Sequence, residues 1–294
     1  LKGTEIGWSR AGERRGYRGP GTLVPTEVYD NLYKEFNPTQ FDAREWIAIA
    51  QSAGMKYIVF TSRHHDGFSM FDTQADDYKI TSPLSPYRRD IVRQLADASH
   101  AANLKFGLYY SQPNWHHPDA FTPDRHDRYL AYLQAQVREL CTNYGRLDIL
   151  WFDGLGKTAA DYGAVEINRM ARELQPHLII NNRNGLPEDF DTPEQRVGKY
   201  QDNRPWESCI TICKQWAWKP CDTMKSLEEC LQTLVRCVGG DGNLLFNVGP
   251  MPDGRIEPRQ VERLKEMGAW LAKNGESIYA TRGGPWHPKS EFAS

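Results

Sequence analysis

The feature that most constrains the fold is an alternation of short apolar runs with longer amphipathic segments, repeated along most of the 294-residue chain. Each apolar run is rich in β-branched or aromatic residues and is bounded by Gly, Asn, Asp or Pro, which is typical of buried strands. We expect strands at residues 4–8, 57–61, 106–110, 147–152, 178–181, 208–212 and 243–248. We expect helices at residues 41–53, 91–102, 125–144, 160–175, 224–238 and 258–274.

This alternation predicts an α/β fold, because apolar strands joined by helices form a parallel sheet that is covered on its faces. The seven units approach the eight of a (β/α) barrel of TIM type, and no Gly-rich phosphate fingerprint follows the first strand. We therefore favour a barrel of seven or eight strands over an open doubly wound sheet. Asp90 and Asp161 are expected at helix N-termini, and Pro258 in a first helical turn. No linker or internal repeat divides residues 1–294, which we predict to form a single catalytic domain.

Composition and charge exclude several classes of partner. The chain carries 36 Lys and Arg against 38 Asp and Glu, so its net charge of −2 gives no reason to expect nucleic acid or a membrane surface. No run of 18 apolar residues predicts a transmembrane helix. Aromatic residues make up 12% of the chain, which fits either a carbohydrate-binding cleft or a packed core.

The six cysteines and the start of the chain carry less information. We expect buried free thiols rather than zinc ligands or a disulfide framework, since no pair is followed by a second pair at a zinc-site spacing. The chain begins at Leu1 without a signal-peptide pattern, so we expect a processed or trimmed form. The compartment stays open, with a periplasmic or secreted location favoured over the cytoplasm, and so does the oligomeric state.

Polar and aromatic residues follow four of the predicted strands, where the reactive residues of a barrel cluster. They read SRHHDGF from Ser62, SQPNWHH from Ser111, DG from Asp153 and NRNG from Asn182. Asp153 ends a strongly apolar strand and precedes a glycine that leaves room for a ligand. It therefore fits the nucleophile of a retaining glycosidase, although its spacing fits a helix N-cap equally well.

A retaining glycosidase needs a second carboxyl group as its acid and base. Glu207 follows Trp206, and an indole neighbour would remove water from the carboxyl and raise its pKa, as a general acid requires. An exposed loop glutamate is the alternative. The rival carboxyl groups are Glu5, Asp66, Glu188, Asp202 and Glu194.

The adjacent His64 and His65 point to opposite sides of an extended segment, so they chelate one metal ion poorly. Hydrogen bonding to a sugar hydroxyl is the role we expect. A structural role remains open for one of the two.

Five motifs, in the same order along the chain as in the family, resemble those of the retaining α-L-fucosidases of glycoside hydrolase family 29. They are KYIVFTSRHHDGF at 56–68, FGLYYS at 106–111 with WHHP at 115–118, DILWFDG at 148–154, GNLLFNVGP at 242–250 with DG at 253–254, and NGESIYATR at 274–282. The resemblance covers most of the chain. It implies hydrolysis of terminal α-L-fucosyl residues on oligosaccharides or glycoconjugates, with net retention and without metal or other cofactor.

The resemblance also implies residue roles. Asp153 corresponds to the family's nucleophile, and Glu207 to the acid/base found in many members as the Glu of a Trp-Glu pair. The residues implied or expected in the sugar pocket are His64, His65, Tyr110, Trp151, Arg183, Trp115 and Trp206.

Two departures from the family pattern bear on the substrate. Members usually carry a sugar-binding His in the first strand where this chain has Gly7. Glu5 would face the same side by strand alternation and is expected to supply the lost hydrogen bond to the sugar. Gly7 therefore leaves open a retaining hydrolase of a related sugar such as an α-L-galactoside. A sugar-binding homologue without catalysis is the alternative from another class. Many members also carry a C-terminal β-sandwich, which we do not expect in this chain.

Overall fold

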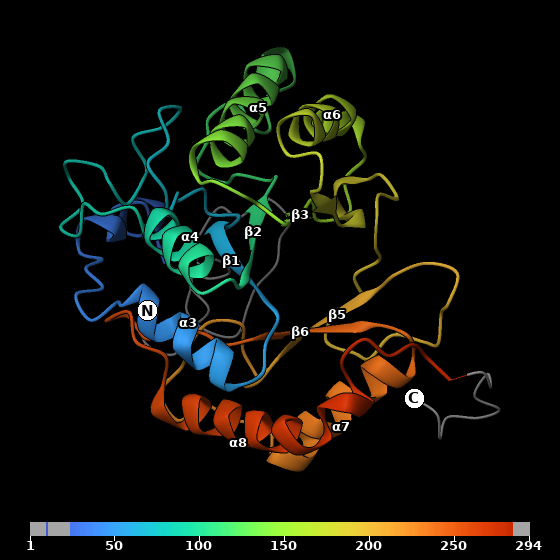
Figure 1. Cartoon of the computed structure of the whole chain (residues 1–294). Helices are drawn as coiled ribbons and strands as arrows, with labels where there is room; N and C mark the ends of the chain where they lie inside the picture. The colour runs from blue at the N-terminus through green and yellow to red at the C-terminus, as the bar shows by residue number, and fades with distance from the viewer. Residues whose placement is uncertain (1–9, 11–23, 285–294) are drawn as a thin grey trace.

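The computed structural model describes residue 10 and residues 24–284, whose strands and helices alternate as predicted (Figure 1). The strands are β1 (Tyr57–Arg63), β2 (Lys105–Ser111), β3 (Ile149–Asp153), β4 (Ile179–Ile180), β5 (Glu207–Thr211) and β6 (Asn243–Asn247). The α-helices are α2 (Thr26–Tyr29), α3 (Ala43–Ser52), α4 (Ile91–Ala101), α5 (His126–Asn143), α6 (Ala164–Leu174), α7 (Leu227–Gly239) and α8 (Pro258–Asn274). The 3-10 turns are η1 (Leu32–Lys34), η2 (Pro123–Arg125), η3 (Ala160–Tyr162), η4 (Asn182–Asn184) and η5 (Gly275–Ser277). The strand predicted at residues 4–8 lies outside the described residues.

All six described strands pair in parallel. β1, β2, β3 and β4 are neighbours in that order, and β5 pairs with β6. An extended segment joins the two sheets, because Phe190 pairs with Asn181 beyond β4 and Glu194 pairs with Cys209 in β5. The long helices lie outside the strands in Figure 1. The predicted α/β barrel class is confirmed, and because its strands run parallel, their carboxyl ends meet at one rim.

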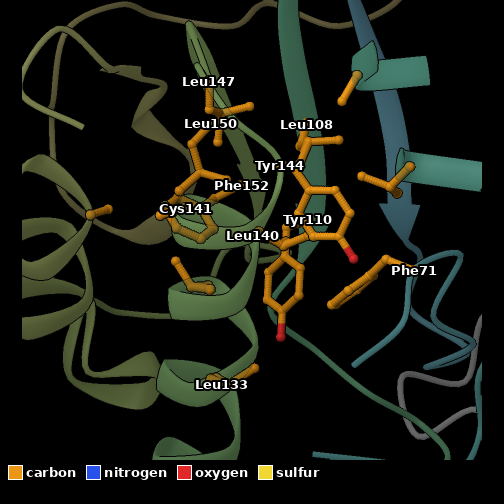
Figure 2. Packing of buried hydrophobic residues seen from close by; sticks show 14 of the residues in the cluster. Phe71, Leu108, Tyr110, Leu133, Leu140, Cys141, Tyr144, Leu147, Leu150 and Phe152 are labelled. Carbon is orange, nitrogen blue, oxygen red and sulfur yellow. The ribbon is translucent and has the colours of Figure 1, made fainter. Parts of the chain in front are cut away.

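Alternation along the strands separates two apolar layers. On the outer face, Leu108, Leu150 and Phe152 pack against Leu133 and Leu140 of α5 (Figure 2). These five side chains are fully buried, as expected for strands covered by helices.

The inner face forms a second apolar layer. Ile149, Trp151 and Cys209 pack with Tyr57 and Leu245 from the strands on either side. Only the strand residues that face inward can line the centre of the barrel at its rim. The alternation of side chains along each strand decides which residues these are.

The helix starts were predicted with one error. Asp90 caps α4 by accepting from the Arg93 backbone N–H at 2.7 Å, and Pro258 opens α8. Asp161 does not cap α6, because its carboxylate accepts from Thr158 within the preceding turn. The helix starts instead after Gly163, whose positive φ of 58° interrupts the predicted helix.

Cysteine placement bears out most of the sequence expectation. All six cysteines are free, and five of them are buried. Cys221 is exposed, contrary to the expectation of buried thiols. Among the residues that the structure describes, none of the helices combines the length and apolarity that a membrane crossing requires.

Candidate active site

Asp153 is the last residue of β3, at the rim where the strands end. The next helical turn, η3, begins only at Ala160, so the carboxylate caps no helix. Two contacts fix the rim here. The Asn181 side chain accepts from the Phe152 N–H at 2.7 Å and donates to the Phe152 carbonyl at 2.9 Å. Gly154 lies so close to the Arg183 carbonyl that a Cβ would meet it at 2.5 Å. The β3 end and the Arg183 turn are therefore held side by side.

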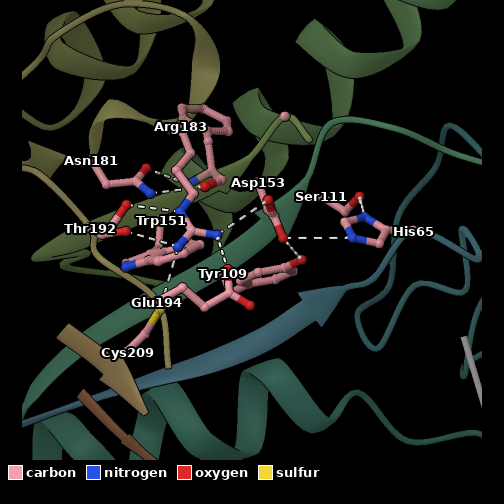
Figure 3. A network of polar contacts seen from close by, with 12 residues as sticks. His65, Tyr109, Ser111, Trp151, Asp153, Asn181, Arg183, Thr192, Glu194 and Cys209 are labelled. Carbon is pink, nitrogen blue, oxygen red and sulfur yellow. Dashed lines mark hydrogen bonds and ion pairs between the residues drawn. The ribbon is translucent and has the colours of Figure 1, made fainter. Parts of the chain in front are cut away.

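Three side chains surround the Asp153 carboxylate (Figure 3). Tyr109 donates its hydroxyl proton to Oδ2 at 2.8 Å, and His65 Nε2 lies 3.6 Å from the same oxygen. Arg183 Nη1 lies 3.8 Å from Oδ1. The two oxygens thus face different partners, which fixes the rotation of the carboxylate.

His65 is held by Ser111 at the end of β2. The Ser111 hydroxyl donates to the Pro113 carbonyl at 2.8 Å and lies 2.6 Å from His65 Nδ1. Because the hydroxyl has a single proton, which Pro113 accepts, Nδ1 carries the proton in the His65 contact. The other ring nitrogen, Nε2, faces Asp153.

Aromatic rings continue the cluster on both sides of His65. The His64 ring lies 4.0 Å from that of His65 and stacks on Tyr109 at 5.8 Å, with 15° between the planes. The Trp115 ring lies 5.3 Å from that of His65. Flat faces beside hydroxyl-binding nitrogens are the kind of surface on which a pyranose ring can lie.

Arg183 connects Asp153 to a second carboxyl group. Its guanidinium lies over the Trp151 ring at 4.7 Å and donates to Thr192 at 2.8 Å and to Glu194 Oε2 at 2.6 Å. The same nitrogen, Nη1, lies 2.6 Å from Glu194 Oε2 and 3.8 Å from Asp153 Oδ1. Those two oxygens are therefore at most about 6.4 Å apart, a limit that admits the ~5–5.5 Å separation of retaining glycosidases.

A cavity of about 610 Å³ opens beside this pair. The residues that line it come from the β3 end, the Arg183 turn and the extended segment, and they are Asp153, Leu155, Gly156, Lys157, Asn182, Arg183, Gly185, Thr192, Pro193, Glu194 and Arg196. Asp153 and Glu194 are thus open to the same space. The volume lies within the range of small-molecule sites.

Glu207 does not join this cluster. It is the first residue of β5, so it lies at the opposite end of the strands from the rim. Trp151 donates its indole proton to Oε1 at 3.0 Å, and the Tyr57 hydroxyl donates to Oε2. Burial raises the pKa of this carboxyl, as the sequence predicted, but both oxygens are occupied from inside the barrel. Glu207 supports the Trp151 ring from below and does not line the cavity.

Two aromatic residues are also placed away from the cluster. Tyr110 points to the outer face, where its hydroxyl donates to Gln136 at 2.9 Å. The neighbouring Tyr109 occupies the place beside Asp153 that was expected for Tyr110. Trp206 packs against glycines, including Gly242, and donates to the Gly240 carbonyl at 3.1 Å. Both corrections follow from strand alternation, which turns adjacent residues to opposite faces.

The structure therefore brings together six residues of the predicted site: Asp153, His64, His65, Trp151, Arg183 and Trp115. Glu5 lies outside the described residues. Tyr109, Ser111 and Glu194 were not selected from the sequence as site residues, although Glu194 stood among the rival carboxyl groups. Strand phase could have identified Tyr109, because it pairs with Trp151 as Ser111 pairs with Asp153.

Comparisons with known proteins point to one family. A family profile described as α-L-fucosidase matches residues 17–276. The plasma α-L-fucosidase of Homo sapiens is 33% identical over 278 residues, which are 87% of this chain and 59% of that protein. The chain thus spans about three fifths of the length of that curated relative.

Two solved structures share the fold. A family 29 α-L-fucosidase of Bacteroides thetaiotaomicron, trapped as a covalent intermediate with 2-fluoro-fucosyl fluoride in a Glu-to-Gln mutant, superposes with a TM-score of 0.82. It is 27% identical, and the match covers 90% of this chain and 68% of that one. An Asp-to-Ala variant of the α-L-fucosidase AlfC, in complex with Fucα(1,6)GlcNAc, superposes with a TM-score of 0.75 at 31% identity, over 86% of each chain.

Proposed function

Because the chain belongs to the α-L-fucosidase family of glycoside hydrolases, family 29, we propose that it removes terminal α-L-fucosyl residues by double displacement. The observation that carries the proposal is the arrangement of Asp153, Arg183 and Glu194 at the rim. Two carboxyl groups bridged by one guanidinium share a cavity, at a separation whose upper limit of about 6.4 Å admits the ~5–5.5 Å of a retaining enzyme.

In this proposal Asp153 attacks the anomeric carbon. Tyr109 donates to Oδ2, so we take Oδ1, which faces Arg183, as the attacking oxygen. The covalent intermediate of the Bacteroides relative supports a retaining mechanism for the family. A carboxylate that is already oriented gives up little rotational freedom when it attacks, which lowers the barrier.

We propose Glu194 as the acid and then the base, in place of Glu207. Glu194 lines the cavity, and its side chain is 43% exposed, so its carboxyl can reach the glycosidic oxygen and later a water molecule. Glu207 can do neither from the inside of the barrel. Arg183 would release one carboxyl as the sugar enters, since it now contacts both.

The fucosyl ring is proposed to lie on the His65 side of Asp153. His64, His65 and Tyr109 supply hydroxyl-binding groups there, and Trp115 supplies a flat face that suits a C6 methyl group, whereas Trp151 backs Tyr109 and Arg183. The fucosylated disaccharide bound by AlfC supports a fucosylated oligosaccharide or glycoconjugate as the substrate. We further propose that residues 1–294 act as one catalytic domain.

The decisive experiment is to trap the nucleophile. Incubation with 2-deoxy-2-fluoro-α-L-fucosyl fluoride, followed by proteolysis and mass spectrometry, should locate the adduct on Asp153. Asp153→Ala should abolish labelling and lower kcat by several orders of magnitude, whereas Asp161→Ala, in the turn before α6, should leave both nearly unchanged. An adduct on any other carboxylate would overturn the assignment.

The second candidate substrate is an α-L-galactoside, which Gly7 in place of the usual His favours. Comparing kcat/KM for the aryl α-L-fucoside and the aryl α-L-galactoside separates the two. We expect the fucoside to be preferred, because the flat aromatic faces beside Asp153 favour a methyl over a hydroxymethyl group only modestly, by about tenfold.

A further inference from the structure

The cavity beside Asp153 carries more positive charge than a neutral sugar needs. Five of its lining residues are charged: Asp153 and Glu194 are acidic, and Lys157, Arg183 and Arg196 are basic. Arg183 already faces both carboxyl groups. When Glu194 is protonated to act as the acid, three cations then face one anion.

Lys157 and Arg196 are the two cations left over. Both are exposed, and within residues 24–284 neither makes an ion pair with a carboxylate. The acidic group that Lys157 influences is Asp161, whose Oδ2 is already occupied by the Thr158 N–H and hydroxyl. Both charges therefore remain available to a ligand in the cavity.

Their positions place them on the leaving-group side. The proton donor must contact the glycosidic oxygen, and the sugar beyond that oxygen must extend past the donor. Arg196 is two residues beyond Glu194 in the same extended segment, and Lys157 is four residues beyond Asp153, in the turn that follows β3; both line the cavity. His65 and Tyr109 on the proposed fucosyl side contact Oδ2 of Asp153, and neither of them lines this cavity.

We infer that this cavity accepts an anionic group, either a sulfate ester or a carboxylate, on the sugar that bears the fucose. This rests on the proposed function, since it assigns the leaving group of that reaction. Lys157 and Arg196, which line the cavity from two different segments, bind the anion. Leu155, partly exposed in the same lining, provides an apolar surface for the sugar ring.

The test compares matched substrates at low salt. A neutral fucosyl-α(1,3)-N-acetylglucosamine, in which O6 is free, is set against its 6-O-sulfate and against fucosyl-α(1,3)-glucuronic acid. We expect kcat/KM to be about three- to tenfold higher for the anionic substrates, because each exposed ion pair contributes modestly. The advantage should shrink as NaCl rises to 0.5 M. The larger of the two preferences identifies the source of the anion.

Variants assign the effect to the site. Lys157→Gln and Arg196→Gln should each reduce the anionic-to-neutral ratio at least twofold, and the double variant should abolish it. Lys265→Gln on α8 and Arg236→Gln on α7 are matched controls, because they remove exposed charges far along the chain from the cavity. A ratio near one in the native enzyme, or an equal loss in the controls, overturns the inference.

A second measurement tests the anion preference of the cavity independently of fucoside hydrolysis. If no fucoside is hydrolysed, calorimetric titration with N-acetylglucosamine 6-sulfate and with N-acetylglucosamine still measures the anion preference of the cavity. Stronger binding of the sulfated sugar that is lost in the Lys157→Gln/Arg196→Gln variant supports the inference, and equal binding overturns it.

Discussion

Removing each of two carboxyl groups, Glu194 and Glu207, should have opposite consequences for stability and catalysis. Glu207→Ala leaves the Trp151 indole N–H and the Tyr57 hydroxyl buried without their acceptor. Each orphaned polar group costs about 1–3 kcal/mol, so the free energy of unfolding should fall by about 2–6 kcal/mol. Glu194→Ala removes a side chain that is 43% exposed, and the protein should remain folded.

Catalysis should respond in the reverse order. We expect Glu194→Ala to lower kcat on a disaccharide by about 10²–10⁴-fold, the usual contribution of a general acid. On an activated aryl fucoside the first step needs little protonation, so added azide should restore turnover and yield α-L-fucosyl azide. Glu207→Gln retains a carbonyl acceptor for Trp151 and an amide partner for Tyr57, so its kcat should fall less than tenfold.

The assays are denaturant unfolding, steady-state kinetics on both substrates, and product analysis with azide. Azide rescue of Glu207→Ala together with no rescue of Glu194→Ala would refute the reasoning. So would a loss of several orders of magnitude in Glu207→Gln while its unfolding curve stays unchanged. Either result would mean that a carboxyl group at the buried end of β5 takes part in proton transfer.

Three further predictions test the surroundings of the site. Tyr109→Phe removes one hydrogen bond to Asp153 and should lower kcat/KM about tenfold, measured on an aryl fucoside, with little change in the melting temperature. Burial raises the pKa of Glu207 above its usual 4.5, so the native protein loses stability as the pH rises through that raised value. Glu207→Gln does not titrate there. Its melting temperature, measured relative to that of the native protein, should therefore increase from pH 4.5 to pH 8. Gly154→Ala should displace the Arg183 turn, because its Cβ would overlap the carbonyl at 2.5 Å, and should lower activity more than stability, as kinetics and thermal unfolding together would reveal.

The sequence predicts the elements of this fold better than the directions of their side chains. The predicted helix at 258–274 matches α8 at both ends, and the described strands all overlap their predicted ranges. Those elements follow from apolar periodicity, which is local. The positions of Asp153 and Arg183 at the rim were also predictable, because Asp153 directly follows the strand predicted at 147–152 and Arg183 lies two residues beyond the one predicted at 178–181.

The face of the sheet to which each strand residue points could not be predicted from the sequence with the same reliability. Between Thr61 and Arg63 the register of β1 shifts, so Arg63 pairs with Tyr110 and turns to the outer face. An irregularity of one residue reverses the side to which the following residues point. Likewise, Trp206 and Glu207 were treated as a contacting pair, yet in an extended segment they face opposite sides, and the indole that contacts Glu207 is that of Trp151.

Glu194 was hidden for another reason. It lies in a segment that the sequence presents as a loop, between β4 and β5, where Pro, Asp and Glu break any apolar periodicity. Its direction is fixed by a bridge to Cys209 and by Arg183, and both contacts join residues distant in sequence. Only the folded chain brings that carboxyl to Asp153.

The inner face of the barrel connects these observations. Glu207 holds the Trp151 indole at the buried end, Trp151 stacks on Tyr109 at 5.5 Å, and Tyr109 donates to Asp153 at the rim. Each contact joins residues on different strands. The side chain at the buried end therefore helps to fix the position of the Asp153 carboxylate at the rim. A carboxyl group suits this role because one oxygen accepts from the Trp151 indole and the other from the Tyr57 hydroxyl. The feature that made Glu207 resemble a catalytic acid, its removal from water, is the same feature that suits it to support Trp151 from inside the barrel.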